Sequence, residues 1–541
     1  MGTQYKTPGV YISEPNSFPP SIVGVETAVP AFIGYTEKAR YGARDLHLLP
    51  TRIGALADYV ARFGNGFRPA CYLLPETELV PAGDRRIGAA AFYEGGPVYS
   101  LVRSGTRDFN LYESLQLFFN NGGGDCYIVS CGQYDEIPPA AVAKGRLIDG
   151  LAVIGSIVGP TILVMPDAVL LDDPADYDEL AVAMLEQCMR LQDRVAILDV
   201  WGTYDIAAPV PPPGPNGANV TMESRIERFR AGLAGAPPES LRYGMAYVPN
   251  LATSLVSAAD IGIGDFDTAG DRLDTLVAAL TDCAAHDEAP AIAGLIGKLG
   301  TSVPDAQAEP GTPLRGGAMS HSELTKALLA GLPPLARLFQ QVADSRNVLP
   351  PSGAMAGIFA RTDADPGVWN APANVGVATV IAPTVAISDD QQQDMNTPSD
   401  GKAVNAIRTF PGRGPLVWGA RTLDGNSNDW RYIHVSRTMI YIEQSVKTAL
   451  GNFVFAPNTA QTWVTVVATI ESFLHGLWSA GGLMGNSPKD AFFVGCGLGS
   501  TMTADDILNE VMVVAITVQI ANPLEFINIV FQQQMLGGPH A

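Results

Sequence analysis

The stretch Thr161-Ile162-Leu163-Val164-Met165 is a continuous apolar run, and two further apolar runs follow it, Val195 to Val200 and Gly244 to Val248. Between the first two lies Asp176 to Leu191, whose apolar residues recur at helical spacing. Short apolar runs that alternate with helical segments are typical of strands covered by helices on both faces of a largely parallel sheet. Residues 151–250 therefore predict an α/β layer.

The residues before this layer predict further strands and a further helix. Thr27 to Gly34 is a further apolar strand, and the helix Phe109 to Asn120 is expected to end at Gly122-Gly123-Gly124 before a strand at Cys126 to Ser130. Residues 41–107 are rich in Gly, Pro and Arg and indicate an irregular surface insertion. Residues 251–345 predict helical segments at the periphery.

The C-terminal region begins after a polar break, Ser388 to Gly401. We expect a strand at Tyr432 to Ser436, a helix at Arg437 to Leu450 and a long helix at Asn458 to Trp478. The apolar face of the long helix predicts a core contribution from Trp463, Val466, Val467, Ile470, Phe473, Leu474 and Leu477. Ala491 to Val494 and the alternating segment Val511 to Ile520 predict strands.

A short strand pattern lies near each end of the chain, beyond a break marked by proline. The first is Gly9 to Ser13 and the second is Leu524 to Gln532. Such strands either pair within the subunit or extend as arms that add to the exposed sheet edge of a neighbour. The pattern alone leaves both alternatives open.

Composition excludes several classes of protein. The 541 residues are 47% hydrophobic and suggest several domains, while only 16% are charged and the formal net charge is −21. Because this charge repels phosphate and no basic cluster offsets it, we expect no nucleic-acid partner. The apolar runs are too short to predict membrane insertion, the start lacks a signal peptide pattern, and the six cysteines are too sparse for a disulfide framework. We expect assembly in the cytoplasm.

A search for catalytic motifs gives little. The sequence contains no phosphate-binding loop, zinc-protease or nucleophile-elbow motif, and its six histidines are scattered. Cys126 and Cys131 point to opposite faces of one predicted strand, so a shared metal is not expected. Asp363 and Asp365 resemble an acid/base pair but have no candidate nucleophile. We therefore predict no catalytic residues, no metal, no cofactor and no enzyme.

The segment from Leu349 to Asn374 carries a recognisable signature. It reads Pro350-Pro351-Ser352-Gly353-Ala354-Met355-Ala356-Gly357-Ile358-Phe359-Ala360-Arg361-Thr362-Asp363, followed by Gly367-Val368-Trp369-Asn370-Ala371-Pro372-Ala373-Asn374. Further motifs are Asn405 to Arg408, Trp418 to Thr422, Asp429 to Arg437 and Pro523 to Ile527, with Pro8 to Ile12 and Thr27 to Gly34 at the start. Together they resemble the contractile tail sheath proteins of phage tails, R-type pyocins and extracellular contractile injection systems. Asn370 departs from the basic residue common at its position in that pattern.

The resemblance implies a multi-domain α/β (α+β) protein. An inner sheath domain would form from both chain ends, residues 1–25 plus 345–541, and residues 26–344 would form an inserted outer α/β part with variable insertions at about 41–107 and 251–340. The terminal strands would be inter-subunit arms, formed by Gly9, Val10, Tyr11, Ile12, Ser13, Leu524, Glu525, Phe526, Ile527, Ile529 and Phe531. The motif residues expected to have structural roles are Pro350, Pro351, Ser352, Gly353, Gly357, Arg361, Asp363, Gly367, Trp369, Pro372 and Asn374.

The same resemblance implies a structural function. The chain would polymerise as stacked hexameric rings around an inner tube protein, bind baseplate and terminal cap proteins, and contract to drive the tube through a target envelope. The particle would be a phage tail or a phage-tail-like assembly of the kind released outside the cell. The alternative is a cytosolic α/β enzyme with an appended oligomerisation domain.

Overall fold

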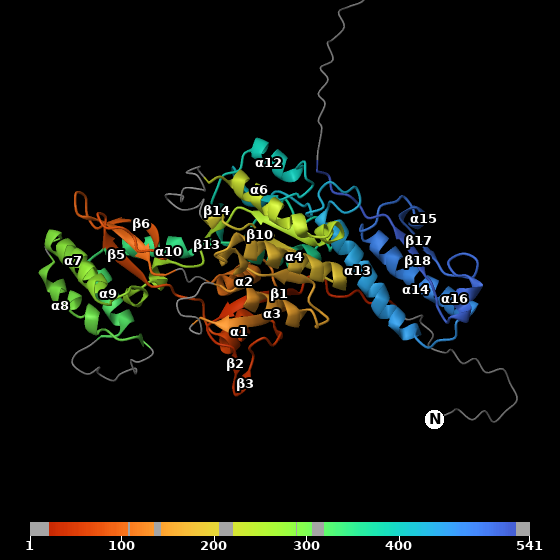
Figure 1. Cartoon of the computed structure of the whole chain (residues 1–541), viewed down its shortest axis with the longest axis horizontal. Helices are drawn as coiled ribbons and strands as arrows, with labels where there is room; N and C mark the ends of the chain where they lie inside the picture. The colour runs from red at the N-terminus through yellow and green to blue at the C-terminus, as the bar shows by residue number, and fades with distance from the viewer. Residues whose placement is uncertain are drawn as a thin grey trace, which may run out of the picture. The chain divides into compact units, whose positions relative to one another are not determined.

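A computed structural model describes residues 21–105, 109–134, 142–204, 220–287, 289–305 and 319–525 (Figure 1). The chain divides into two compact units. The larger unit is Glu26–Arg437, and the smaller unit combines Met1–Val25 with Thr438–Ala541. The boundary between them falls inside helix α13 (Ile433–Leu450).

The predicted α/β layer is the centre of the larger unit. Its eight-stranded sheet has the order β16-β15-β11-β10-β9-β1-β8-β4. The strands are β1 (Pro30–Thr36), β4 (Thr51–Ile53), β8 (Cys126–Gln133), β9 (Ile162–Val164), β10 (Val195–Asp199), β11 (Gly244–Val248), β15 (Asn405–Phe410) and β16 (Gly414–Val417). The six central strands run parallel, and only the edge strands β4 and β16 pair antiparallel. The largely parallel sheet predicted from the apolar runs is confirmed.

Helices accompany this sheet. They are α1 (Leu56–Phe63), α2 (Leu111–Asn120), α3 (Lys144–Ile154), α4 (Pro174–Leu191), α6 (Met222–Gly232), α11 (Ser352–Ala364) and α12 (Asp389–Asn396). α4 begins where the Asp173 carboxylate accepts the Ala175 N–H and Pro174 occupies the first turn. α2 ends as predicted, because Gly122 takes a φ of 103° and Gly123 donates back to the Phe118 carbonyl at 2.9 Å.

Short elements complete the larger unit. A small antiparallel sheet joins β12 (Leu251–Thr253) to β13 (Val348–Leu349) and β14 (Val380–Pro383), and a hairpin pairs β2 (Arg40–Tyr41) with β3 (Arg44–Asp45). Among the described residues of this unit the 3-10 turns are η1 (Ala168–Leu170), η3 (Leu233–Gly235), η4 (Pro238–Tyr243), η5 (Ala258–Asp260), η6 (Ile263–Asp265), η7 (Pro290–Ile292) and η8 (Leu299–Thr301), and η11 (Gly451–Phe453) lies in the smaller unit.

Residues 71–103 and 261–346 fold together into what we call the inserted lobe. Its antiparallel sheet has the order β5-β7-β6, formed by β5 (Cys71–Pro75), β7 (Val98–Arg103) and β6 (Arg85–Ala91). Its helices are α7 (Asp271–His286), α8 (Ala293–Ile296), α9 (His321–Gly331) and α10 (Leu335–Arg346). One hydrophobic cluster joins the sheet to the helices, with Leu101, Leu280, Leu328 and Phe339 fully buried.

The prediction that residues 41–107 are irregular is therefore wrong. β4, α1 and β5 to β7 all fall in this range. The three short strands of the inserted lobe bury their apolar side chains against residues 261–346, far along the chain, so no local pattern signals them. The helices of 251–345 are confirmed, but they complete this shared core.

The smaller unit contains the rest of α13, together with α14 (Ala460–Ser479), α15 (Pro488–Ala491), α16 (Ala504–Leu508), β17 (Phe492–Gly495) and β18 (Ala515–Val518). The long helix predicted at 458–478 is confirmed as α14. Val466, Ile470, Leu474 and Leu477 are buried, whereas Trp463, Val467 and Phe473 are only half-buried. The predicted strands at 491–494 and 511–520 are present as the antiparallel pair β17 and β18.

The strand predicted at Tyr432 to Ser436 is wrong, because α13 begins at Ile433. Ile433, His434 and Ser436 are each at most 2% exposed, so this first turn is buried on several sides. A short buried run of this kind does not distinguish strand from helix. The predicted arm strand at 9–13 and most of the one at 524–532 lie outside the described residues.

Candidate functional site

The carboxyl edge of the parallel sheet is the place where α/β enzymes bind their ligands. Here the protein's own polar groups fill it. The buried Asp167 carboxylate, which follows β9, accepts the N–H groups of Tyr35 at 2.9 Å and Asn110 at 2.6 Å. The Asn110 side chain donates to the Pro166 carbonyl at 2.9 Å and accepts from the Tyr204 hydroxyl at 3.1 Å. This edge fixes the start of α2 and the end of β1 to each other.

A second buried carboxylate lies at the end of β10. Asp199 accepts both the N–H and the hydroxyl of Ser352, so it caps the first turn of α11. Burial raises the pKa of Asp199 to about 7, while the two hydrogen bonds from Ser352 oppose that rise. The motifs recognised in the sequence do not include Asp199, although a carboxylate inside an apolar run at a strand end is a usable signal.

The signature segment Pro350 to Asp363 is mainly helix α11, and it serves close packing. Residues 352–359 are all buried, so the helix is covered on every side. A Cβ added at Gly353 would stand 2.4 Å from the Ser114 carbonyl oxygen, and one at Gly357 would stand 2.4 Å from that of Phe118. The two glycines therefore let α11 approach the backbone of α2 one turn apart.

Asp363 and Arg437 join two distant motifs. The guanidinium donates to both carboxylate oxygens, at 2.8 and 2.6 Å, and the Arg437 and Asp363 side chains are 3% and 5% exposed. Arg437 also donates to the Thr27 carbonyl at 3.0 Å and lies over the Phe359 ring at 4.6 Å. Asp363 is thus a structural anchor for the first turn of α13.

The remaining motif residues shape the loop after α11. Gly367 has a φ of 136°, and a Cβ there would meet the Trp369 ring at 2.5 Å. Arg361 donates to the Gly376 carbonyl at 2.8 Å, and Asn374 accepts from Arg413 at 2.8 Å with a left-handed φ of 57°. Pro350, Pro351 and Pro372 are buried. These motif residues therefore stabilise the conformation of the loop that follows α11.

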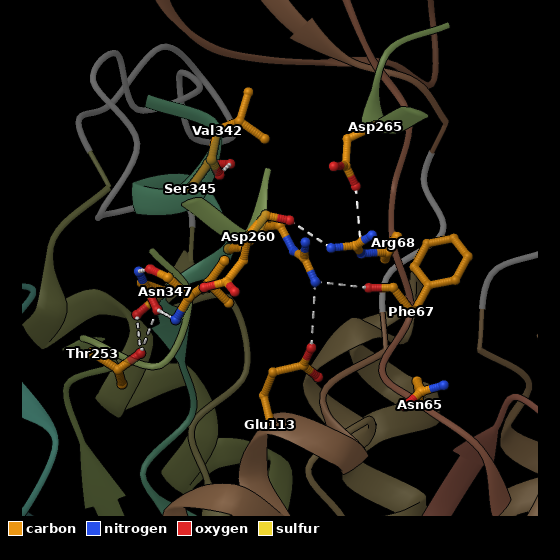
Figure 2. A network of polar contacts seen from close by, with 12 residues as sticks. Asn65, Phe67, Arg68, Glu113, Thr253, Asp260, Asp265, Val342, Ser345 and Asn347 are labelled. Atoms are coloured by element: carbon orange, nitrogen blue, oxygen red, sulfur yellow. Dashed lines mark hydrogen bonds and ion pairs between the residues drawn. The ribbon is translucent and has the colours of Figure 1, made fainter. Parts of the chain in front are cut away.

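A polar network joins the inserted lobe to the α/β layer (Figure 2). Arg346, at the end of α10, lies 3.8 Å from the Glu113 carboxylate of α2 and donates to the Phe67 carbonyl at 3.4 Å. Arg68 donates to the Asp260 carbonyl at 2.6 Å and lies 3.5 Å from Asp265. Arg68 and Arg346 lie next to the points where the chain enters and leaves the inserted lobe, so their contacts hold the lobe to the α/β layer.

Metal chemistry has no support in the part of the chain that the structure describes. No group of three or more His, Cys, Asp or Glu side chains there could hold an ion. Asp265 accepts the Gly262 N–H at 2.8 Å and Asp267 pairs with Arg272, so these two neighbouring carboxylates already have partners within the protein. Across the described ranges, no helix is both long enough and apolar enough to cross a membrane.

Exposed apolar side chains gather in the smaller unit. Of sixteen exposed large hydrophobic side chains among the described residues, eleven belong to it. They include Phe455 at 103%, Leu508 at 79%, Phe493 at 63% and Leu524 at 88% exposure. Single exposed apolar residues are ordinary, but here most of those described belong to one small unit.

β17 and β18 form an isolated two-stranded sheet in that unit. Within the described residues no further strand extends either outer edge of the pair. The segment 511–520 alternates between exposed and half-buried side chains and buries none of them fully. A two-stranded sheet is marginally stable by itself, so added strands would stabilise it.

Most of the C-terminal segment of the smaller unit is similar to a known protein family. Residues 426–534 match the phage tail sheath C-terminal domain family. The tail sheath protein of Burkholderia phage BcepMu is 28% identical over 157 residues, which cover 28% of this chain and 33% of that relative. The aligned segment thus spans about a third of the relative's length. Sheath proteins of this kind are structural, so the alternative of a cytosolic enzyme is set aside.

Solved structures extend the likeness to the whole chain. The sheath complex of the extracellular contractile injection system PVC, in its contracted state, is 24% identical with a TM-score of 0.56, covering 98% of this chain and 99% of that one. The contracted helical sheath of the anti-feeding prophage is 24% identical with a TM-score of 0.53, covering 98% and 100%. The resemblance drawn from the sequence motifs is confirmed. Residues 426–534 are therefore similar to the phage tail sheath C-terminal domain, and the chain as a whole has the fold of the contractile sheath proteins.

Proposed function

We propose that this chain is a subunit of the contractile sheath of a phage tail or phage-tail-like injection particle. The observation that carries the proposal is the position of the exposed apolar side chains. They are concentrated in the unit that matches the sheath C-terminal domain, where a copy of the same chain would cover them.

The polymer we propose consists of stacked hexameric rings linked by strand arms. Gly9 to Ser13 and the segment Leu524 to Phe531 would add to exposed sheet edges of neighbouring subunits. The support is the unextended β17–β18 pair and the 88% exposure of Leu524 at the point where the described chain ends. Backbone hydrogen bonds of added strands survive rotation of the subunits, so the arms would act as tethers.

The domain assignment remains part of this proposal. Residues 1–25 plus 345–541 would form the inner sheath domain and residues 26–344 the outer part. The two compact units of the chain divide it elsewhere, at residues 25/26 and 437/438. Segment 345–437 belongs to the larger unit, where β15 pairs with β11.

Contraction would convert a long lattice into a shorter one with more buried contact. If each subunit gained about 100 to 200 Å² of apolar burial, about 2.5 to 5 kcal/mol would be available per subunit before ordering costs. Summed along a sheath, this would drive an inner tube through a target envelope without nucleotide hydrolysis. The partners are further copies of the chain, the inner tube protein, and baseplate and cap proteins, with assembly in the cytoplasm.

Electron microscopy of the purified chain, alone and with the tube protein of the same particle, tests the proposal. We expect long striated hollow cylinders, wider when the tube is absent because the sheath then reaches its contracted lattice. Small uniform particles under both conditions would contradict it. A salt titration of the extended particles adds a second test, since the charge of −21 predicts that basic groups on the tube offset repulsion between subunits.

A further inference from the structure

The hairpin formed by β2 and β3 is an unusual surface for this acidic chain. All six residues from Arg40 to Asp45 are exposed, and Tyr41 keeps 60% of its surface open. Arg40 and Arg44 form no ion pair with any described residue, while the Asp45 carboxylate accepts the His47 N–H at 2.9 Å. The hairpin therefore presents two guanidinium groups beside an aromatic ring.

The hairpin is held firmly at its base. Ala39 and Leu46, which flank it, are 4% and 3% exposed, and the Leu46 N–H donates to the Ala39 carbonyl at 2.9 Å. Gly42 supplies the left-handed turn with a φ of 59°. Arg62 of α1 lies 5.4 Å from the centre of the Tyr41 ring. A pre-ordered protrusion loses little entropy on binding.

A groove of complementary chemistry lies between α6 and α12. It has a volume of about 90 Å³, and buried Met222, Ile226 and Met395 form its apolar floor. Glu223, Glu227 and Asp394 line its exposed rim. Its one cation, Arg230, is occupied by the carbonyls of Lys402 and Asp394, at 2.9 Å each. The groove thus combines room for an apolar group with an acidic rim.

The two surfaces lie towards opposite edges of the eight-stranded sheet. α1 contacts both the hairpin strand β2 and the edge strand β4, while α12 contacts β15, which is next to the other edge. Within the larger unit, Figure 1 shows the β2–β3 hairpin and α12 at opposite ends. A hairpin and groove so placed cannot meet in one copy, and a contact between copies is head-to-tail, which closes into a ring or continues as an open helical polymer.

We propose that the β2–β3 hairpin of one copy docks into the α6–α12 groove of a second copy. Tyr41 enters the apolar floor, and Arg40 and Arg44 pair with the carboxylates of the rim. Aromatic and Arg side chains are the groups that most often anchor protein interfaces. The occupant is a second copy, because the two arginines of the hairpin complement the acidic rim of the groove on the same chain. This inference rests on the proposed sheath function, in which copies of the chain bind one another. The contact is separate from the strand arms.

Disulfide trapping between two singly substituted chains tests the docking without requiring a sheath. In a background carrying Cys496→Ser, a chain with Ala43→Cys at the hairpin turn is mixed with a chain carrying Ala386→Cys in the groove. We expect a disulfide-linked dimer from this mixture. The matched control replaces the second chain with one carrying Ala336→Cys, exposed on α10, and should give no dimer. Equal trapping in both mixtures would overturn the docking.

Charge exchange tests the same contact in assembly. Arg40→Glu with Arg44→Glu should raise the concentration needed for polymerisation about tenfold, as like charges then face each other. Adding Glu227→Arg and Asp394→Arg to the same chain should restore assembly, whereas Arg337→Glu, an exposed arginine of α10, should leave it unchanged. Polymers with no specific trapping and no rescue would refute the hairpin contact alone. Specific trapping without any polymer from the unsubstituted chain would refute the sheath function instead.

Discussion

The carboxylate of Asp363 in α11 and the guanidinium of Arg437 in α13 form a buried two-bond ion pair, with N–O distances of 2.8 and 2.6 Å. Arg437 is the last residue of the larger unit, and α13 continues from it into the smaller unit. The pair therefore anchors the first turn of α13, a helix that lies within the segment 426–534 similar to the sheath C-terminal domain.

Removing one partner of this pair should be costly. We expect Arg437→Met to destabilise the larger unit by about 3 to 5 kcal/mol, because the Asp363 carboxylate would remain buried without its partner. Urea unfolding followed by circular dichroism measures the loss. Asp365→Asn, two residues away and exposed, is the control and should change stability by less than about 0.5 kcal/mol. Equal effects of the two changes would show that the pair does not anchor α13.

The glycines of the signature helix should not tolerate alanine. Gly357→Ala would place a Cβ 2.4 Å from the Phe118 carbonyl oxygen, so α11 and α2 must separate at a cost of about 1 to 3 kcal/mol. Thermal unfolding provides the measurement. Gly476→Ala in α14, where an added Cβ meets nothing within 4 Å, should instead stabilise its helix by about 0.5 to 1 kcal/mol. Tolerance at Gly357 would mean that close packing does not explain the motif.

Asp199 should make stability depend on pH. Its folded pKa is raised from 3.8 to about 7, so the folded state binds the proton more tightly than the unfolded chain does. The free energy of unfolding should therefore fall as pH rises from about 4 to about 7. Asp199→Asn should remove this dependence of the free energy of unfolding on pH. The control Asp149→Asn, at an exposed residue, should leave it unchanged. A slope that persists in Asp199→Asn would assign it to other groups.

The inserted lobe should unfold as one body. Leu328→Ala removes a fully buried side chain of α9 and should cost about 2 to 5 kcal/mol. Because β5 to β7 share this core, limited proteolysis of the Leu328→Ala variant should cleave the chain in both 71–103 and 261–346. Leu79→Ala, at a residue 94% exposed, should leave the digestion pattern unchanged. Cleavage confined to 261–346 would contradict a shared core.

Truncation of the chain tests the proposed strand arms. Ending the chain before Leu524, or deleting residues 1–15, should abolish ordered cylinders in electron micrographs while circular dichroism still shows a folded subunit. Deleting only residues 535–541 keeps the predicted strand and should preserve the cylinders. Normal cylinders without residues 1–15 would remove the N-terminal arm from the proposal.

Much of this protein follows from local sequence pattern. The apolar runs at 161–165, 195–200 and 244–248 and the helical spacing of 176–191 and 458–478 predicted elements that are present in the fold. A parallel strand buried on both faces must be apolar throughout, and a helix with one buried face must repeat its apolar residues every three or four positions. The ordered motifs likewise indicated the sheath family before any coordinates.

Tertiary structure alone decided three other features. The inserted lobe joins residues 71–103 to 261–346, the helix at Ile433 replaces a predicted strand, and Asp363 binds Arg437 rather than forming an acid/base pair with Asp365. Each depends on contacts between residues far apart in the chain. Burial by a distant segment supplies the free energy that selects one conformation of a short, ambiguous stretch, and no pattern within that stretch records its distant partner.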